Sequence, residues 1–189
     1  MSQNNFQQRK KDVLSKLDKS SKKGWDKKIL KLCEKINSKN NYYTTSSCSG
    51  RIVLIIDQDK KDKNLFFKIY HNPISINQFK KNLNEILKKN KKSIKFKQEP
   101  FILHIVCKSL KDVQELLNKA KLAGLKKSGI IALKKRIILE LNSTEKLEFP
   151  IIDKGRILVD DKFLKLIIEK SNENLKKSWK KIEKLRKSI

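Results

Sequence analysis

The chain has 189 residues, of which 47 are Lys or Arg and 20 are Asp or Glu, giving a formal net charge of +27. This length suits one well-buried core and is short for two, so we expect a single domain over residues 1–189 with a basic helical C-terminus at about 161–189. The cation excess favours a polyanionic partner, either nucleic acid or an anionic membrane surface. Because only five of the cations are Arg, and Lys, Asn and Ile are all abundant, a lysine excess produced by an AT-biased genome is the alternative.

The sequence argues against a membrane-spanning protein and against a disulfide-rich one. No apolar run approaches the ~20 residues that a membrane-spanning helix needs, and residues 1–5 lack the apolar core of a signal peptide, so we expect a cytoplasmic protein. Cys33, Cys48 and Cys107 are odd in number and widely spaced, which argues against a disulfide framework. They also lack the spacing of zinc ligands, and we expect no metal. Cys33 and Cys107 fall in apolar patterns and are expected in the core.

Apolar residues at helical spacing predict two helices at the start of the chain. The first covers residues 6–17, and the second opens near Trp25 and Asp26 and ends at Asn37. The stretch Asp18-Lys-Ser-Ser-Lys-Lys-Gly24 separates them. Its Asp and Ser residues are typical helix caps and its lysines are typical of a surface, so the local pattern alone gives this turn no function.

The next stretch is poor in lysine and passes from strand-forming residues into small polar ones. Residues 42–45 predict the end of a strand, the apolar run 52–56 predicts a buried strand, and residues 46–51 are predicted to form the loop between them. This loop offers Ser hydroxyl and backbone N–H donors, Gly50 tolerates a positive φ, and Arg51 carries a guanidinium suited to a carboxylate or phosphate. The loop therefore suits an anionic or zwitterionic ligand, and a solvated Ser-rich turn is the alternative.

The rest of the chain mixes strands and helices irregularly. Strands are predicted at 52–56, 65–70, 94–97, 101–106, 130–133, 137–141, 147–152 and 156–159, and helices at 76–87, 110–120 and 161–189. Ser109 and Asp160 are predicted to cap helices, and Gly124 to end one. Because the order is not a regular βαβ alternation, we predict an α+β fold with a mixed β-sheet flanked by helices. The Gly-rich turn of a doubly wound sheet is missing, so the fold is expected to be non-Rossmann.

Six motifs occur in an order that resembles a known family. They are Asp18-x-Ser20-x-x-Lys23-Gly24, Thr44-Thr-Ser-Ser-Cys-Ser-Gly-Arg51, His71, Glu99-Pro-Phe-Ile-Leu-His-Ile-Val-Cys107, Gly124-Leu-Lys-Lys-Ser-Gly-Ile130, and Ser143-Thr144 with Leu147, Glu148 and Pro150. Together they resemble the wybutosine-synthesising protein 3 family, tRNA methyltransferases that act on a tricyclic guanosine next to the anticodon. The resemblance covers about residues 6 to 186. Where the family often has a basic residue before the Ser-Thr pair, this chain has Asn142.

The resemblance implies an S-adenosylmethionine-dependent methyltransferase. The implied reaction methylates N4 of the 4-demethylwyosine-type guanosine-37 of phenylalanine tRNA, so the expected partner is the anticodon loop of that tRNA, bound by a monomer. The activated donor makes alignment the main task, but the attacking nitrogen must lose a proton. A neutral His can accept it, and the chain has only His71 and His104, both at family positions. A hydrogen-bonded core residue is the alternative for His104.

The resemblance also implies which residues bind the two ligands. The expected cofactor-binding residues are Ser46, Ser47, Ser49, Gly50, Arg51 and Glu99. The expected substrate-binding residues are Ser20, Lys23, Tyr43, Ser128 and Gly129. For Glu99 the alternative is a surface ion pair, for Tyr43 it is packing within a strand, and for Ser128 it is a plain turn.

Two other classes of function fit the composition. A non-enzymatic, basic tRNA- or RNA-binding module would use its lysines alone and bind no cofactor. A structural or interaction protein would owe its charge to the genome. Both leave the concentration of Ser, His, Arg and Glu at turns and strand ends unexplained, which favours an enzyme.

Overall fold

The structure is a computed structural model that describes residues 3–16, 26–58 and 65–189. The predicted ligand-binding residues Ser20 and Lys23 lie outside the described residues. The chain forms two compact units. Unit 1 comprises Met1–Ser49, Phe101–Thr144 and Ser178–Ile189, and unit 2 comprises Gly50–Pro100 and Glu145–Lys177. In the described residues no helix is long and apolar enough to cross a membrane.

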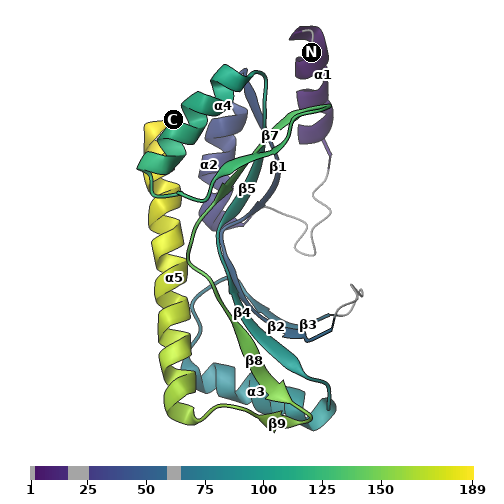
Figure 1. Ribbon diagram of the computed structural model, residues 1–189, viewed down its shortest axis with the longest axis vertical. Coiled ribbons are helices and arrows are strands. Elements are labelled where there is room, and N and C mark those ends of the chain that lie inside the picture. Colours follow the sequence, from purple (N-terminus) through teal and green to yellow (C-terminus); the bar gives the residue numbers. More distant parts are fainter. Residues whose placement is uncertain (1–2, 17–25, 59–64) are drawn as a thin grey trace. The chain divides into compact units, whose positions relative to one another are not determined.

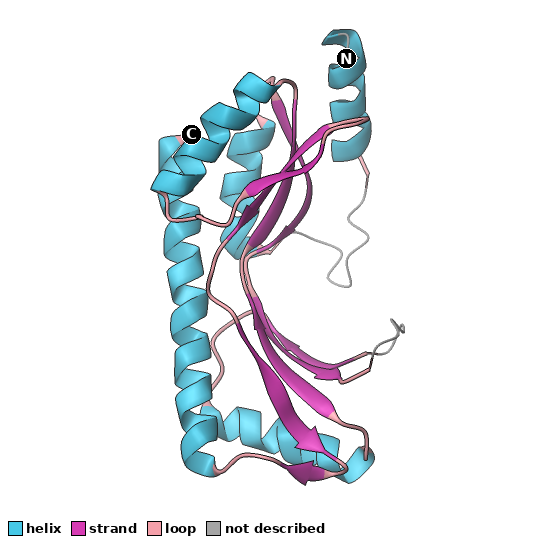
Figure 2. Ribbon diagram, in the orientation of Figure 1, coloured by secondary structure: helices cyan, strands magenta, loops and turns pink. Residues whose placement is uncertain are grey.

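Unit 1 is a four-stranded antiparallel sheet with helices on both faces (Figures 1 and 2). Its strands are β1 (Tyr42–Cys48), β5 (Ile102–Cys107), β6 (Gly129–Ala132) and β7 (Ile137–Asn142), and its helices are α1 (Gln3–Leu14), α2 (Lys27–Asn37) and α4 (Leu110–Leu122). The strand order is β1-β5-β7-β6. The last residues of α5 (Asp161–Ser188) also belong to this unit.

The side chains of β5 point alternately to the two faces of this sheet, and one of these faces carries the main hydrophobic core. Leu103 and Ile105 are fully buried in a cluster with residues of α2, α4 and the end of α5. Val106 points to the opposite face and packs with Tyr43 and Phe6 of α1. His104 shares that second face, because successive side chains of a strand alternate between the two faces.

Unit 2 is a five-stranded antiparallel sheet covered by α3 (Ile76–Lys89) and by the first part of α5. Its strands are β2 (Arg51–Ile56), β3 (Phe66–Tyr70), β4 (Ile94–Glu99), β8 (Leu147–Asp153) and β9 (Arg156–Ile157), in the order β3-β2-β4-β8-β9. A series of contacting aromatic rings joins α3 to α5 across this sheet. Phe79 meets Phe96 edge-on at 5.8 Å, Phe96 stacks on Phe149 at 5.1 Å, and Phe149 meets Phe163 edge-on at 5.6 Å.

The predicted helix ends are confirmed where side chains can cap the backbone. The Ser109 hydroxyl accepts from Asp112 N–H at the start of α4, and the Asp160 carboxylate accepts from Phe163 N–H at the start of α5. Gly124 follows α4 with φ +95°, a conformation that favours glycine.

The α+β class without Rossmann alternation is confirmed, but two details of the prediction are wrong. The strands form two antiparallel sheets and not one mixed sheet. Furthermore, Ser46 and Ser47 belong to β1 and not to a loop, because this strand pairs with β5 as far as Cys48. The connection to β2 is therefore only Ser49-Gly50, and Gly50 has the positive φ, +98°, that the sequence suggested.

Candidate functional site

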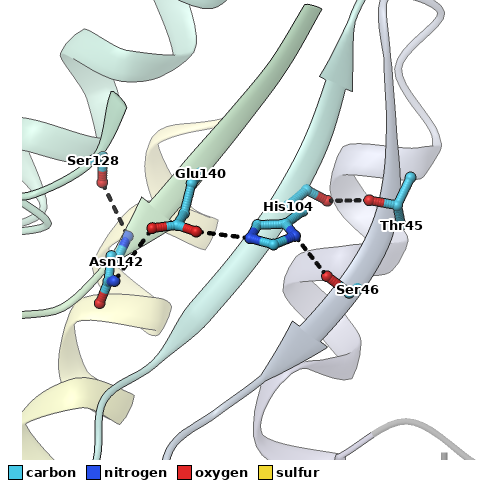
Figure 3. A network of polar contacts seen from close by, with 6 residues as sticks. All are labelled: Thr45, Ser46, His104, Ser128, Glu140 and Asn142. Carbon is cyan, nitrogen blue, oxygen red and sulfur yellow. Dashed lines mark hydrogen bonds and ion pairs between the residues drawn. The ribbon is translucent and has the colours of Figure 1, made fainter. Parts of the chain in front are cut away.

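Ser46, His104 and Glu140 lie next to one another across three strands of unit 1 (Figure 3). Ser46 on β1 is paired with His104 on β5, which is paired in turn with Glu140 on β7. The His104 Nδ1 atom is 2.8 Å from Ser46 Oγ, and its Nε2 atom is 2.8 Å from Glu140 Oε2. We call these three side chains the polar row.

The polar row is open to solvent, although its neighbours on one side are covered. The adjacent residues along the same strands, Tyr43 and Val106, pack beneath Phe6. Ser46 is exposed, and the side chains of His104 and Glu140 are 28% and 24% exposed. A ligand can therefore reach the row without any rearrangement of the core.

Asn142 and Ser128 extend the network from Glu140 to the edge strand (Figure 3). The Asn142 side-chain amide donates to Glu140 Oε1 at 3.4 Å, and the Asn142 backbone N–H donates to Ser128 Oγ at 3.1 Å. The Ser128 hydroxyl donates in turn to the Leu125 carbonyl at 2.8 Å. Ser128 thus organises the turn before β6 and stays a predicted substrate contact, and Asn142 contacts the second carboxylate oxygen of Glu140.

Unit 2 contains a second polar pair at the start of β2. Arg51 is paired with Glu99 of β4, and Arg51 Nε donates to Glu99 Oε2 at 2.5 Å. The guanidinium also lies over the Phe66 ring, 5.2 Å from its centroid. The two charged side chains remain 28% and 33% exposed, so the pair places a cation and an anion side by side at the surface of this unit.

Comparison with known proteins decides the family. The chain matches the family described as Methyltransferase TYW3 over residues 8–189. It belongs to that family.

Relatives and solved structures agree over nearly the whole chain. A Thermococcus sibiricus protein named tRNA(Phe) 7-((3-amino-3-carboxypropyl)-4-demethylwyosine(37)-N(4))-methyltransferase is 35% identical, covering 98% of this chain and 94% of that protein. A tRNA wybutosine-synthesizing protein 3 homolog from Danio rerio is 34% identical, covering 97% of this chain and 74% of that protein. The structure of PH1069 protein from Pyrococcus horikoshii has a TM-score of 0.86 at 33% identity, covering 99% of this chain and 95% of that chain.

In this TYW3 family member, two other serines of the motif Thr44 to Arg51 have partners on α2. Ser47 hydrogen-bonds the buried thiol of Cys33 on α2, where burial raises the thiol pKa to about 12. Ser49 is fully buried, and its hydroxyl donates to the Asp26 carboxylate at the start of α2. Both hydroxyls therefore hold β1 and its end against α2, and the two serines stay predicted cofactor-binding residues.

The expected substrate-binding residue Tyr43 is also packed within unit 1. Its side chain is 1% exposed, and its ring centroid lies 5.3 Å from that of Phe6. Phe6 of α1 packs against this ring, and Tyr43 stays a predicted substrate contact. Gly129 differs, since it is paired with Glu140 and has no atom within 4 Å of the place where a Cβ would lie.

The two predicted catalytic histidines belong to different units. His104 lies in β5 of unit 1, whereas His71 is half-buried in the turn that follows β3 of unit 2. His104 has the ordered chain of side-chain partners expected of a residue that moves a proton.

Glu140 is the member of the network that sequence reasoning missed. Within β7 it reads as the solvent-facing residue of an alternating strand, Ile-Ile-Leu-Glu-Leu-Asn. The signal that could have found it is that β5 and β7 have the same pattern. In each strand one polar residue, His104 or Glu140, stands between two buried aliphatic residues. Pairing those strands in register would have placed Glu140 opposite His104.

Proposed function

We propose that this chain is an S-adenosylmethionine-dependent methyltransferase that methylates N4 of 7-(3-amino-3-carboxypropyl)-4-demethylwyosine at position 37 of phenylalanine tRNA. Membership of the TYW3 methyltransferase family and the printed activity of the Thermococcus sibiricus relative support this reaction. The structural observation that carries the proposal is His104, held between Ser46 and Glu140 on an open face of a sheet.

His104 supplies the acid–base part of the proposed reaction. S-adenosylmethionine, when bound, supplies an already activated methyl group, so the protein has to align the two ligands and take up one proton. An imidazole is suited to accept that proton near neutral pH. Glu140 then faces the resulting cation at Nε2 with a carboxylate oxygen.

Arg51 and Glu99 fit the amino-acid end of the cofactor. That end is a zwitterion, and a guanidinium beside a carboxylate offers one partner for its α-carboxylate and one for its α-ammonium. Glu99 engages Arg51 at Nε, and among the described residues no hydrogen bond from the two terminal guanidinium nitrogens is found. We therefore assign the cofactor's amino-acid moiety to this pair and keep His71, in the same unit, as the second candidate for proton transfer.

The proposed substrate complex is one monomer on the anticodon loop of phenylalanine tRNA in the cytoplasm, without a metal. The net charge of +27 supports fast, salt-dependent association with tRNA. Gly129 is the proposed neighbour of the tricyclic base, because it leaves open space beside Glu140. Ser20 and Lys23 stay predicted substrate contacts.

The test is methyl transfer to phenylalanine tRNA purified from a strain that lacks this modification step. Incubation with S-adenosylmethionine should convert the demethylwyosine nucleoside into a product heavier by one methyl group, detected by mass spectrometry of digested tRNA. Phenylalanine tRNA without the tricyclic base is the control and should gain nothing. Binding of tRNA with neither cofactor binding nor methylation would refute the enzyme and leave a basic RNA-binding module.

A further inference from the structure

Both ring nitrogens of His104 are engaged, which fixes where its proton lies. A carboxylate oxygen only accepts hydrogen bonds, so the contact between Nε2 and Glu140 requires the proton on Nε2. In the neutral ring Nδ1 is then an acceptor, and the Ser46 hydroxyl must donate to it across 2.8 Å. The geometry therefore defines one direction of donation, from Ser46 through His104 to Glu140.

Ser46 is the most exposed member of the polar row. It lies on β1, an edge strand of the sheet, and its residue is exposed. His104 lies between β1 and β7 and has no ring nitrogen left for a ligand unless one of its present partners is displaced. A proton that enters the row therefore has a ready path through the Ser46 oxygen.

We propose that Ser46, His104 and Glu140 form a proton relay, with Ser46 as the group that touches the substrate. The inference rests on the proposed methyltransferase function. The substrate N–H bond breaks, its electron pair stays on the nitrogen, and its proton passes to Ser46 Oγ while the Ser46 proton passes to His104 Nδ1. Ser46 thus ends as a neutral hydroxyl, and His104 ends as an imidazolium whose Nε2–H still donates to Glu140.

Glu140 is a positioning residue in this relay. It holds the ring so that Nδ1 faces Ser46, and it stabilises the cation that forms. Its own orientation is set from both sides, because Oε2 accepts from His104 and Oε1 accepts from the Asn142 amide.

The decisive variant is Ser46→Ala, because the three possible roles of this hydroxyl predict different kinetics. For a relay, kcat falls by about 10²–10⁴-fold, His104→Ala has the same effect, and the double variant is no worse than either single one. The dissociation constant for S-adenosylmethionine, measured by calorimetry, stays at the wild-type value. Thr45→Ala is the matched control, since its hydroxyl is directed to the His104 backbone carbonyl and not to the ring.

Two kinetic results would overturn the relay. If His104 takes the proton directly, Ser46→Ala frees Nδ1 and leaves kcat unchanged or raised. If Ser46 only binds the cofactor, the variant weakens cofactor binding while kcat at saturating cofactor is unchanged. If the wild-type protein transfers no methyl group, the proposed function is refuted. The tautomer of His104, measured by NMR, would still report on the hydrogen bonds of the polar row.

The imidazole tautomer gives a readout that does not depend on activity. The chain has only two histidines, so nitrogen NMR spectra of the full-length protein contain two imidazole rings, and His71→Gln assigns them. We expect the Nε2–H tautomer for neutral His104, and loss of that preference in Glu140→Gln but not in Glu115→Gln, which changes an exposed glutamate on α4. Glu140→Gln should also lower kcat without changing KM for the cofactor. A predominant Nδ1–H tautomer in the wild type would overturn the relay.

Discussion

Arg51 and Glu99 face each other directly across strands β2 and β4, with Nε and Oε2 2.5 Å apart. About a third of each side chain is exposed, at 28% and 33%, so water screens the pair and its contribution to folding stability is small. What the pair does provide is a fixed arrangement of opposite charges at the first residue of β2, directly after Gly50. Its loss should therefore affect ligand binding more than folding.

Arg51→Ala should weaken S-adenosylmethionine binding by about 10–100-fold, the cost of one charge-assisted hydrogen-bonded contact. The free energy of unfolding should change by less than about 1 kcal/mol. Calorimetric titration at moderate salt measures the first quantity, and urea denaturation measures the second. Arg156→Ala removes another exposed arginine from unit 2 and is the matched control. Equal cofactor affinity in the two variants would remove Arg51 from the proposed site.

Local sequence was sufficient for most elements because their signals are local. Ser109 and Asp160 are capping residues whose side chains accept backbone N–H groups within the same turn, and the aromatic and apolar spacing of α3 needs no distant partner. The extent of β1 could not be predicted in the same way. Ser46 and Ser47 have weak strand preference, and they are extended because β5, whose paired residues are more than fifty positions away, supplies the hydrogen-bonding partners.

Most residues of the candidate site could be proposed from the sequence, with Glu140 the exception, but their pairings could not. Ser46, His104, Arg51 and Glu99 were all expected at a site, but which of them would meet depends on strand register. A shift of one residue between β5 and β7 would move Glu140 to the opposite face from His104. Burial of Tyr43 beneath Phe6 was equally inaccessible, because α1 is joined to β1 through a long intervening stretch.

Ser143→Ala should destabilise unit 1 by about 1–3 kcal/mol, the cost of leaving a buried backbone donor without a partner. The Ser143 hydroxyl accepts from Phe101 N–H at 3.1 Å and lies 3.0 Å from the Ser178 hydroxyl, and both serines are buried. Urea denaturation of the variant measures the loss. Ser15→Ala, at an exposed serine after α1, should unfold as the wild type does. An unchanged midpoint for Ser143→Ala would show that water replaces the hydroxyl.

Alkaline pH should destabilise the fold through two buried thiols. Burial raises the pKa of Cys33 and of Cys107 from 9.0 to about 12. The unfolded chain therefore releases these protons above pH 9.0 while the folded chain retains them until about pH 12, so the unfolded state binds fewer protons and stability falls as pH rises. Well inside this window each thiol contributes a slope approaching about 1.4 kcal/mol per pH unit.

Urea denaturation at a series of alkaline pH values measures this slope. Cys33→Ala loses packing at every pH but should show a shallower decline than the wild type. Cys48→Ala is the comparison, because it removes a thiol that is only partly buried. Equal slopes in all three proteins would contradict the assignment to buried thiols.

The β6–β7 hairpin should contact the tRNA backbone. Its tip carries Lys134, Lys135 and Arg136, all exposed and without an ion-pair partner among the described residues, and β7 continues from the tip to Glu140. At ~3.3 Å per residue, phosphates bound at the tip would lie about 13 Å along the strand from the polar row, within the span of a few nucleotides. Such contacts position an RNA without reading its sequence.

The double variant Lys134→Ala/Lys135→Ala should therefore bind tRNA more weakly and with less dependence on salt. In a plot of log K against log salt concentration, the magnitude of the slope should fall by about 0.7–0.9 for each phosphate contact removed. Filter binding over a range of salt concentrations measures both effects. Lys111→Ala/Lys121→Ala removes the same charge from exposed positions on α4, which packs on the opposite face of the same sheet. If the lysine excess acts only through net charge, the two double variants will lose affinity and slope equally. A larger loss for the hairpin variant would instead locate the tRNA at the β6–β7 hairpin.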